Sequence, residues 1–339
     1  HITDGLVDRG VATPDHVIRI KPKPWILTRS MQIEGQKAIN DGLETYISDY
    51  KRYFMKWSAQ ADEPKTMLDP KPKVVWVEGF GLIGIGRSLK EAKTIIDIAV
   101  QNILVITDSE GAGGFYPVKN KDLFDMEYWS LEQAKLKTIS SLPLQGKITL
   151  VTGAAGGIGT AIVNSFVEAG AEVVAVDIDM NALKQSSFVS KVQTRNIDVT
   201  DEQQVKLLIE DLVYQFGGID ILVSNAGMAF QSSLLEMEMN DLRKSFEINF
   251  FSHFSLAKLI GQLFVEQGNK GQMLFNISKQ AVNPGRNFGA YGLPKSTLMF
   301  LVKQLALELG SYGIRVNGIN ADRVRSGMLS EKFVKERAK

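Results

Sequence analysis

The stretch Thr152-Gly153-Ala154-Ala155-Gly156-Gly157-Ile158-Gly159 decides the fold of this chain. It directly follows an apolar run, Ile148–Val151, and it opens a helical pattern over Ile158–Ala169. Small residues between a strand and a helix let the backbone approach a pyrophosphate closely, and the helix start offers free N–H groups and a positive dipole end. The stretch therefore predicts a dinucleotide-binding strand, loop and helix.

The segments after this loop alternate between short apolar runs and helical patterns. The predicted strands are Glu172–Val176, Ile219–Val223, Gln272–Ile277 and Arg315–Ile319, and the predicted helices are Glu202–Phe216, a long one ending near Gln267, and Lys295–Leu309. Short apolar strands separated by helices indicate βαβ units, with helices on both faces of a parallel sheet. We thus predict an α/β fold, a Rossmann-like doubly wound parallel sheet, over residues 144–339.

Residues 1–140 are predicted to form a separate and smaller α/β region. Its expected elements are a short strand at Val17–Ile20, one long amphipathic helix over Met31–Trp57, a strand at Val74–Val77, a helix over Leu89–Val100, a strand at Asn102–Thr107 and a helix over Leu131–Thr138. The segment Ser140–Gly146 is the predicted domain boundary.

A second glycine-rich run, Gly79–Gly86, allows two interpretations. It follows a predicted strand and fits the spacing of a dinucleotide-binding loop, with Asp108 closing a later strand. The residues between its glycines are apolar, however, and alternate as in two strands of a hairpin. The hairpin is the favoured interpretation.

The side chain that closes the strand after the first loop indicates which cofactor binds. Asp177 stands at the end of Glu172–Val176, where a carboxylate accepts hydrogen bonds from the adenosine ribose hydroxyls and repels a 2′-phosphate. No Arg or Lys stands in the loop to receive such a phosphate. The pattern favours NAD as the cofactor; the alternative is an ordinary surface aspartate.

Composition excludes several classes of function. The formal net charge is +1, which argues against a broad surface for nucleic acid or for an anionic membrane. The chain has no cysteine, so disulfides and thiolate chemistry are excluded, and a cytoplasmic location is expected. Its three histidines are His1, His16 and His253, so we expect no metal site. His253 lies in an apolar helical pattern and is expected to be a packed side chain.

The motifs after the loop resemble those of the short-chain dehydrogenase/reductase family. They are the glycine loop, Asn196-Ile197-Asp198-Val199, Asn225-Ala226-Gly227, Asn249 and Tyr291-x3-Lys295, in the family's order. The resemblance implies catalytic roles for Asn249, Ser278, Tyr291 and Lys295. It implies cofactor contacts for Gly153, Gly156, Gly157, Ile158, Gly159, Asp177, Asp198, Val199, Asn225, Ala226, Gly227, Tyr291, Lys295 and Val324.

The chemistry of the Tyr291 and Lys295 pair fits this resemblance. The pKa of a free tyrosine is about 10, too high for a base at neutral pH. A lysine four residues later lies on the same helix face, where its cation stabilises the phenolate. Tyr291 then accepts the alcohol proton as hydride leaves, Ser278 holds the substrate oxygen, and Asn249 anchors a water that leads from Lys295 to solvent. An ordinary helix-start pair is the alternative for a lone YxxxK.

Three departures from the family pattern leave alternatives open. Lys279 occupies the position of the family's second serine when counted from Asn276, whereas Ser278 has the expected separation from Tyr291 and is favoured. Ala321-Asp322 replaces the usual Pro-Gly, and Ser224 replaces the first Asn of Asn-Asn-Ala-Gly. Lys279, Arg323 and Arg325 either bind an anionic substrate group or are solvated or ion-paired.

The whole chain also resembles the bifunctional class II aldolase/short-chain dehydrogenase family, associated with rhamnulose-1-phosphate cleavage and lactaldehyde oxidation. The segments that carry this resemblance are residues 1–24, 65–88 and 124–136 together with the dehydrogenase motifs. It implies an oxidoreductase acting on a small hydroxyaldehyde or sugar-derived alcohol, and a homo-oligomer. The aldolase's metal-binding histidines and the dehydrogenase's C-terminal lid and last strand are expected to be missing from this chain. The alternatives are a non-catalytic NAD-binding module and part of a metal-dependent aldolase.

Overall fold

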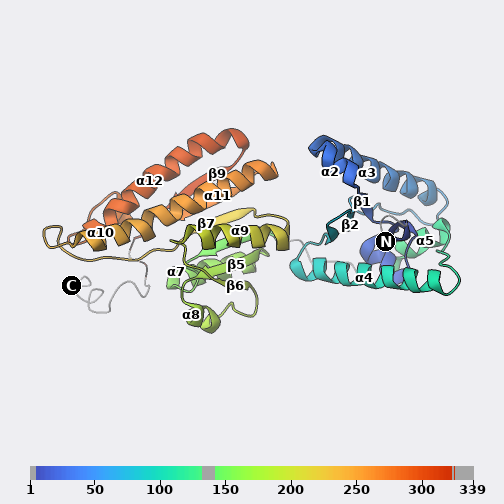
Figure 1. Ribbon diagram of the computed structural model, residues 1–339, viewed down its shortest axis with the longest axis horizontal. Helices are drawn as coiled ribbons and strands as arrows, with labels where there is room; N and C mark the ends of the chain where they lie inside the picture. The colour runs from blue at the N-terminus through green and yellow to red at the C-terminus, as the bar shows by residue number, and fades with distance from the viewer. Residues whose placement is uncertain (1–4, 132–141, 323, 325–339) are drawn as a thin grey trace. The chain divides into compact units, whose positions relative to one another are not determined.

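The computed structural model describes residues 5–131, 142–322 and 324, and the chain divides into two compact units (Figure 1). Unit 1 is His1–Ser141 and unit 2 is Leu142–Lys339, so the division falls within the predicted boundary segment Ser140–Gly146. The helix predicted over Leu131–Thr138 lies outside the described residues, apart from its first position.

Unit 2 contains a six-stranded parallel sheet. Its strands are β4 (Ile148–Thr152), β5 (Glu172–Asp177), β6 (Gln193–Asn196), β7 (Ile221–Ser224), β8 (Gln272–Asn276) and β9 (Arg315–Ile319), in the order β6-β5-β4-β7-β8-β9. Every neighbouring pair is parallel. The chain leaves β4 toward one edge and returns at β7 toward the other, which creates the switch point where such sheets bind ligands. The predicted doubly wound sheet is confirmed.

Helices cover both faces of this sheet. They are α7 (Gly157–Glu168), α8 (Met180–Gln185), α9 (Glu202–Phe216), α10 (Met239–Phe246), the π-helical turn η2 (Glu247–Phe251), α11 (Ser252–Gln267), η3 (Lys279–Ala281), α12 (Gly289–Leu309) and η4 (Gly310–Tyr312). On one face, α9, α11 and α12 pack on strand residues such as Leu150 and Val174. On the other, α7 and α8 pack on Val151 and Val173. Successive strand residues thus enter opposite cores, as strand geometry requires.

Unit 2 differs from its prediction in three elements. Helix α8 and strand β6 were not predicted: α8 has only six residues, and β6 (Gln-Thr-Arg-Asn) is a polar edge strand without an apolar run. Helix α12 begins at Gly289, six residues before the predicted start, so Tyr291 and Lys295 both lie within it.

Unit 1 has a small mixed sheet with helices around it. Its elements are η1 (Leu6–Asp8), α1 (Pro14–Ile20), β1 (Trp25–Leu27), α2 (Arg29–Glu34), α3 (Gln36–Ser58), β2 (Val74–Val77), β3 (Gly81–Gly84), α4 (Leu89–Gly111) and α5 (Asn120–Glu127). Strand β1 pairs with β2 in parallel, and β2 pairs with β3 antiparallel. The hairpin interpretation of Gly79–Gly86 is therefore confirmed, because a strand and not a helix follows β2.

Three predictions for unit 1 are wrong, for related reasons. The expected strand Val17–Ile20 is part of α1, whose apolar side chains join a core with α4 and α5. The expected single helix Met31–Trp57 is two helices, broken at Gly35, whose φ of 86° lies outside the helical region. The expected strand Asn102–Thr107 continues α4, because Ile103 and Ile106 lie on one helical face with Ile95 and Ala99.

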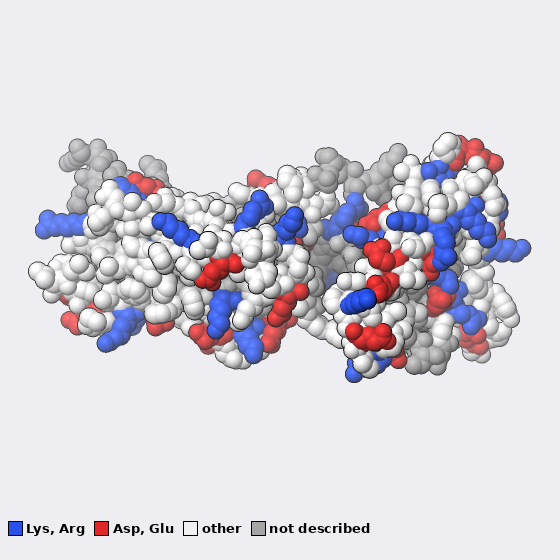
Figure 2. Space-filling view, turned by 90° about the horizontal axis from the view of Figure 1, so that it is seen from above, with Lys and Arg blue, Asp and Glu red and all other residues white. Residues whose placement is uncertain are grey.

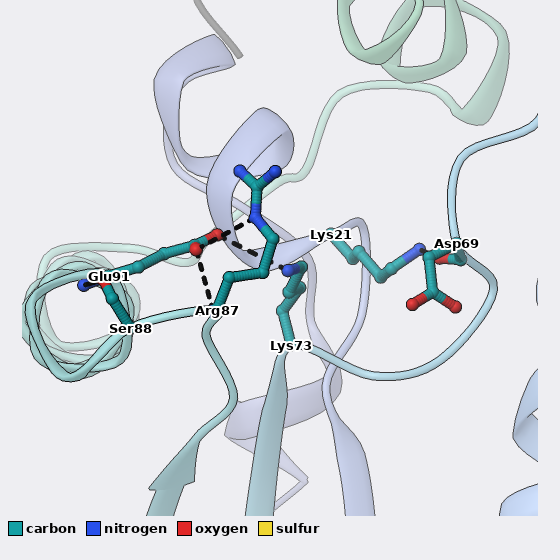
Figure 3. Close-up of polar contacts among 6 residues, drawn as sticks. All are labelled: Lys21, Asp69, Lys73, Arg87, Ser88 and Glu91. Atoms are coloured by element: carbon teal, nitrogen blue, oxygen red, sulfur yellow. Dashed lines mark hydrogen bonds and ion pairs between the residues drawn. The ribbon is translucent and has the colours of Figure 1, made fainter. Parts of the chain in front are cut away.

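A capping arrangement fixes the start of α4 (Figure 3). Ser88 accepts a hydrogen bond from Glu91 N–H at 3.1 Å, and the Glu91 carboxylate accepts one from Arg87 N–H at 2.9 Å. Lys73 lies 3.6 Å from the same carboxylate. Burial raises the pKa of Glu91, but the Arg87 hydrogen bond and the two cations outweigh it, so the pKa stays below its usual value. The start of the long helix is thus held by charge as well as by its cap.

The charged side chains are mixed in sign on the face of the molecule that Figure 2 shows. Lys and Arg lie among Asp and Glu there, in keeping with the formal net charge of +1. Among the described residues, no helix is both long and apolar enough to cross a membrane.

Candidate active site and nucleotide pocket

The glycine loop joins β4 to α7 at the switch point of the sheet. Gly153 has a φ of 62°, in the left-handed region that favours glycine. A Cβ on Gly159 would overlap the carbonyl oxygen of Gly153, so this position in the first turn of α7 accepts only glycine. Gly156 is the N-cap of α7. The loop therefore brings bare backbone to the start of a helix, the arrangement that binds phosphate groups.

A pocket of about 870 Å³ opens in front of this loop. Its volume is in the range of small-molecule and cofactor sites. The loop and the ends of β5, β7 and β8, with the residues after β6, supply its lining: Gly153, Ala155, Gly156, Gly157, Ile158, Gly159, Asp177, Ile178, Ile197, Asp198, Val199, Thr200, Asn225, Ala226, Gly227, Met228, Ala229, Gln231, Ile248 and Asn276. The structure thus gathers eleven residues predicted to bind cofactor and adds others from the same segments.

Asp177 lies at the end of β5 with its carboxylate close to the glycine loop. It accepts hydrogen bonds from the N–H groups of Ala155 and Asp179, both at 3.0 Å. Asp198, after β6, accepts from the N–H and hydroxyl of Thr200 at 2.9 and 2.7 Å. Two carboxylates with fixed orientations therefore stand on one side of the pocket.

Asn225 links the loop to the other half of the site. Its side-chain amide donates to the carbonyl groups of Thr152 and Gly153, at 3.0 and 3.1 Å. Its side-chain oxygen accepts from Asn276 at 2.9 Å. The Asn276 carbonyl in turn accepts from Lys295 Nζ at 2.9 Å. One chain of hydrogen bonds thus runs from the glycine loop to the lysine of α12.

Tyr291, Ser278 and Lys295 come together beside this chain. Tyr291 and Ser278 hydrogen-bond through their side chains, and both are largely buried. Burial raises the pKa of Tyr291 above its usual value, while the Ser278 hydrogen bond opposes the rise. Ser278 is the N-cap of η3 and accepts a hydrogen bond from Gln280 N–H at 3.2 Å, which orients its hydroxyl.

Lys295 is the most deeply buried cation in the described part of unit 2. It is 2% exposed, and burial lowers its pKa to about 7. Its Nζ lies 5.8 Å from the centre of the Tyr291 ring. Within residues 142–322, the structure shows no carboxylate in ion-pair contact with this lysine. A buried cation without a counter-charge is costly, and such groups gather at functional sites.

Asn249 lies in the π-helical turn η2, between α10 and α11. Its amide group donates to the Met228 carbonyl at 2.8 Å and to Ser245 Oγ at 3.1 Å. Ser245 Oγ donates to the carbonyl of Ala290 at 2.7 Å. This carbonyl has no helical hydrogen bond from residue 294, because Pro294 lacks an N–H. Single π-helical turns are frequent at functional sites. The proline before Lys295 is thereby coupled to the position of Asn249.

Two of the remaining predicted residues, Lys279 and Val324, do not line the pocket. Lys279 lies next to Ser278, but its amino group pairs with Asp322 at 3.3 Å, so it is ion-paired. Val324 is exposed and does not line the pocket, so its predicted cofactor contact stays a prediction. Arg323 and Arg325 lie outside the described residues.

Both described histidines are buried. His253 is packed, as expected, with Ser224 Oγ 2.6 Å from its Nδ1. His16 lies in unit 1 between Thr13, at 2.5 Å, and Gln101. Within the described parts of the chain, no three His, Asp or Glu side chains gather as metal ligands.

Several pocket residues were missed by the sequence analysis. Ile178, Thr200 and Met228 directly follow predicted residues, so extending each motif by one position would have found them. Ala229, Gln231 and Ile248 carry no motif, and only the fold brings them to the pocket.

Comparison with known proteins agrees with this geometry. The sequence model of the short chain dehydrogenase family matches residues 147–337, and that of the second domain of class II aldolases matches residues 2–136. Together with the sheet order and the glycine loop, this match shows that the chain belongs to the short-chain dehydrogenase family. It is an oxidoreductase chain with an aldolase-derived N-terminal region.

Similar sequences include an oxidoreductase and a steroid dehydrogenase. The chain is 28% identical over 330 residues to "Uncharacterized oxidoreductase YuxG" of Bacillus subtilis, covering 94% of this chain but 48% of that protein. It therefore spans about half the length of this relative. It is 34% identical to the 7alpha-hydroxysteroid dehydrogenase of Escherichia coli, covering 58% of this chain and 78% of the enzyme.

Solved structures match unit 2. The 3-ketoacyl-(acyl-carrier-protein) reductase of Brucella melitensis, complexed with NADH, is 26% identical with a TM-score of 0.52, covering 54% of this chain and 78% of the reductase. The aldohexose dehydrogenase of Thermoplasma acidophilum is 27% identical with a TM-score of 0.50, covering 54% and 68%.

Proposed function

We propose that this protein is an NAD-dependent dehydrogenase that interconverts a small alcohol or hydroxyaldehyde and its carbonyl product, with Tyr291 as the acid/base. The observation that carries the proposal is the meeting of Tyr291, Ser278 and a buried Lys295 beside the nucleotide pocket. Lys295 reaches the pocket through Asn276, whose carbonyl it binds and which itself lines the pocket.

The three side chains divide the proton chemistry between them. Tyr291 Oη accepts the proton of the substrate hydroxyl, and Ser278 Oγ, already hydrogen-bonded to Tyr291, holds the substrate oxygen. Lys295 must lower the pKa of Tyr291, which burial raises, and its own pKa rises when an anionic phenolate stands beside it. Asn249 anchors the path by which Lys295 regains a proton.

The pocket fits NAD, which when bound accepts the hydride from the substrate carbon. Bare backbone at Gly153–Gly159 receives the pyrophosphate, and the Asp177 carboxylate stands where the adenosine ribose would lie. Because a 2′-phosphate would meet this carboxylate, we expect NADPH to bind at least about tenfold more weakly than NADH. Calorimetric titration of both measures this, and equal affinities would contradict the role given to Asp177.

The proposed substrate class is based on similarity to known proteins. The aldohexose dehydrogenase among the similar structures and the resemblance to the bifunctional aldolase/dehydrogenase family both support a small polyhydroxylated or hydroxyaldehyde substrate. A screen of NAD reduction over small aldehydes, polyols and sugars would identify it.

Replacing Tyr291 by Phe tests the mechanism directly. Loss of the proton acceptor should lower kcat by about 10²–10⁴-fold, the usual contribution of general acid–base catalysis, and leave the NADH dissociation constant within about threefold. Exposed Tyr312 in η4, changed to Phe, is the matched control. Unchanged turnover in Tyr291→Phe would contradict the mechanism, and NADH binding without turnover in the wild type would favour a non-catalytic module.

We also propose that the protein is a homo-oligomer. Helices α11 and α12, which pack side by side, expose large apolar side chains: Phe251, preceding α11, with Phe254, Val265, Leu293, Phe300 and Leu307. Apolar side chains gathered on neighbouring helices are typical of an interface. Light scattering of the purified protein would measure the assembly.

A further inference from the structure

Two hydrogen-bonded contacts join the end of β7 and the segment after it to α11 and η2. Ser224, the last residue of β7, places its Oγ 2.6 Å from Nδ1 of His253 in α11. Four residues later, Met228 N–H donates to Asn249 Oδ1 at 3.1 Å, and Asn249 Nδ2 donates to the Met228 carbonyl at 2.8 Å. Ser224 thus pairs with His253 and Met228 pairs with Asn249, so the two contacts are four residues apart in both segments.

The segment between these contacts forms a wall of the nucleotide pocket. Asn225–Gly227 line the pocket, and the first two N–H groups of this segment donate to Thr152 Oγ1 at 3.0 and 3.2 Å. A Cβ on Gly227 would lie 2.9 Å from Asn249 Oδ1 and 3.5 Å from Lys295 Nζ. Because the packing leaves so little room, a small shift of this segment would disturb Asn249, Lys295 and the glycine loop together.

His253 is suited to hold this segment and not to transfer protons. It is fully buried, and burial, followed by the Lys295 cation, lowers its pKa well below the usual value, although the Ala226 backbone raises it slightly. The imidazole is therefore neutral at neutral pH and can share one hydrogen with the Ser224 hydroxyl. Its ring packs 6.2 Å from that of Phe275 on β8, which limits its rotation.

We infer that His253, together with Ser224, is a positioning residue that holds the Asn225–Gly227 wall of the pocket against Asn249 and Lys295. Ser224 stands at the position where the family usually has the first Asn of Asn-Asn-Ala-Gly, and here its shorter side chain is paired with His253 on α11. The inference rests on the proposed function, because its effect on the cofactor is seen only if NAD binds.

Variants that remove either partner test the pair in the full chain. Ser224→Ala and His253→Leu should each weaken NADH binding, and lower kcat/KM for NAD, by about tenfold, the usual effect of leaving one buried hydrogen-bonding group unpaired. His253→Asn places an amide atom where Nδ1 stood and should restore affinity to within about threefold of the wild type. The double variant Ser224→Ala/His253→Leu should bind NADH no more weakly than the single variant with the lower NADH affinity.

Ser252→Ala is the matched control. Ser252 is a buried neighbour of His253 on α11, but its Oγ donates to the Ile248 carbonyl at 2.7 Å and does so within the helical run. We expect its NADH affinity to match the wild type. Wild-type affinity in Ser224→Ala and His253→Leu, or an equal loss in Ser252→Ala, would overturn the inference.

Hydrogen exchange separates failure of the inference from failure of the proposed function. The amides of Asn225 and Ala226 should exchange faster in Ser224→Ala than in the wild type, whether or not NADH binds. A wild type that binds no NADH would refute the proposed function alone, and unchanged exchange would refute the inference alone. If His253→Leu does not fold, Ser224→Ala and His253→Asn decide the question.

Discussion

Lys21 in unit 1 and Lys295 in unit 2 are both buried, and burial lowers the pKa of each, to about 8 and about 7. Their surroundings differ. Lys21 Nζ lies 3.4 Å from the centre of the Tyr50 ring and donates a hydrogen bond to the Asp69 carbonyl. It is also attracted electrostatically by the buried Glu127 carboxylate. Lys295 has the Asn276 carbonyl at 2.9 Å and no ion-paired carboxylate among the described residues.

We propose that this difference separates a structural buried charge, Lys21, from a catalytic one, Lys295. The Lys21 cluster, defined as Lys21, Tyr50, Tyr53, Glu127 and Tyr128, supplies a counter-charge, a ring and hydroxyl donors, including Tyr50 Oη at 2.7 Å from Glu127. Such a network joins α1, α3 and α5 and needs no ligand. Among the described residues, no carboxylate pairs with Lys295, which fits the proposed role of a cation that stabilises a phenolate and binds a ribose.

Lys295→Met should have the largest effect of the substitutions that distinguish the two lysines. Removing the cation that activates Tyr291 should lower kcat on the order of 10³-fold, because the proton acceptor keeps its raised pKa. The thermal unfolding temperature should be unchanged or higher, since methionine fills similar space without an uncompensated charge. A large loss of stability with near-normal activity would mean that Lys295 is structural.

The same change in unit 1 should have the opposite profile. Lys21→Met leaves Glu127 buried without its cation and should destabilise unit 1 by about 3 kcal/mol. All four tryptophans, Trp25, Trp57, Trp76 and Trp129, lie in unit 1, so their fluorescence during urea unfolding reports on this unit alone.

Activity and a second substitution serve as its controls. Lys21→Met should leave NADH affinity and kcat within about twofold of the wild type, because the cluster lies outside unit 2. Lys21→Met/Glu127→Gln should recover part of the lost stability, since the unpaired carboxylate is gone. No recovery in the double variant would show that Lys21 acts by packing on Tyr50 alone.

The two lysines also show what sequence patterns can and cannot predict. The glycine loop, Asp177 and the Tyr291–Lys295 spacing were readable because each depends on residues close together in the chain. The burial of Lys295 and the Ser224–His253 contact were not, because they join segments that meet only in the folded sheet. Helix α4 was missed in part since an apolar run such as Asn102–Thr107 fits a strand and a buried helix face equally well.

The smallest expected effect is a pH dependence confined to unit 1. Burial raises the pKa of Glu127 to about 7, while the hydrogen bond from Tyr50, the Lys21 cation and the nearby Tyr53 hydroxyl oppose the rise. Between the ordinary pKa of a glutamate, about 4.5, and this value, the unfolded chain has released the proton that the folded unit keeps. The unfolded state therefore binds fewer protons, and stability falls as pH rises through this range.

Lys21 contributes a second pH dependence of unfolding stability, with the opposite sign. Its pKa is lowered from 10.5 to about 8, so the unfolded chain binds more protons between these values and stability rises with pH there. Glu127→Gln removes the fall in stability that Glu127 causes at lower pH. Relative to this variant, the wild type should lose on the order of 1–2 kcal/mol between pH 5 and pH 7, measured by tryptophan fluorescence in urea. Parallel pH profiles for the two proteins would mean that Glu127 stays ionised throughout, which would make the Lys21 cluster a permanent ion pair and deepen its contrast with Lys295.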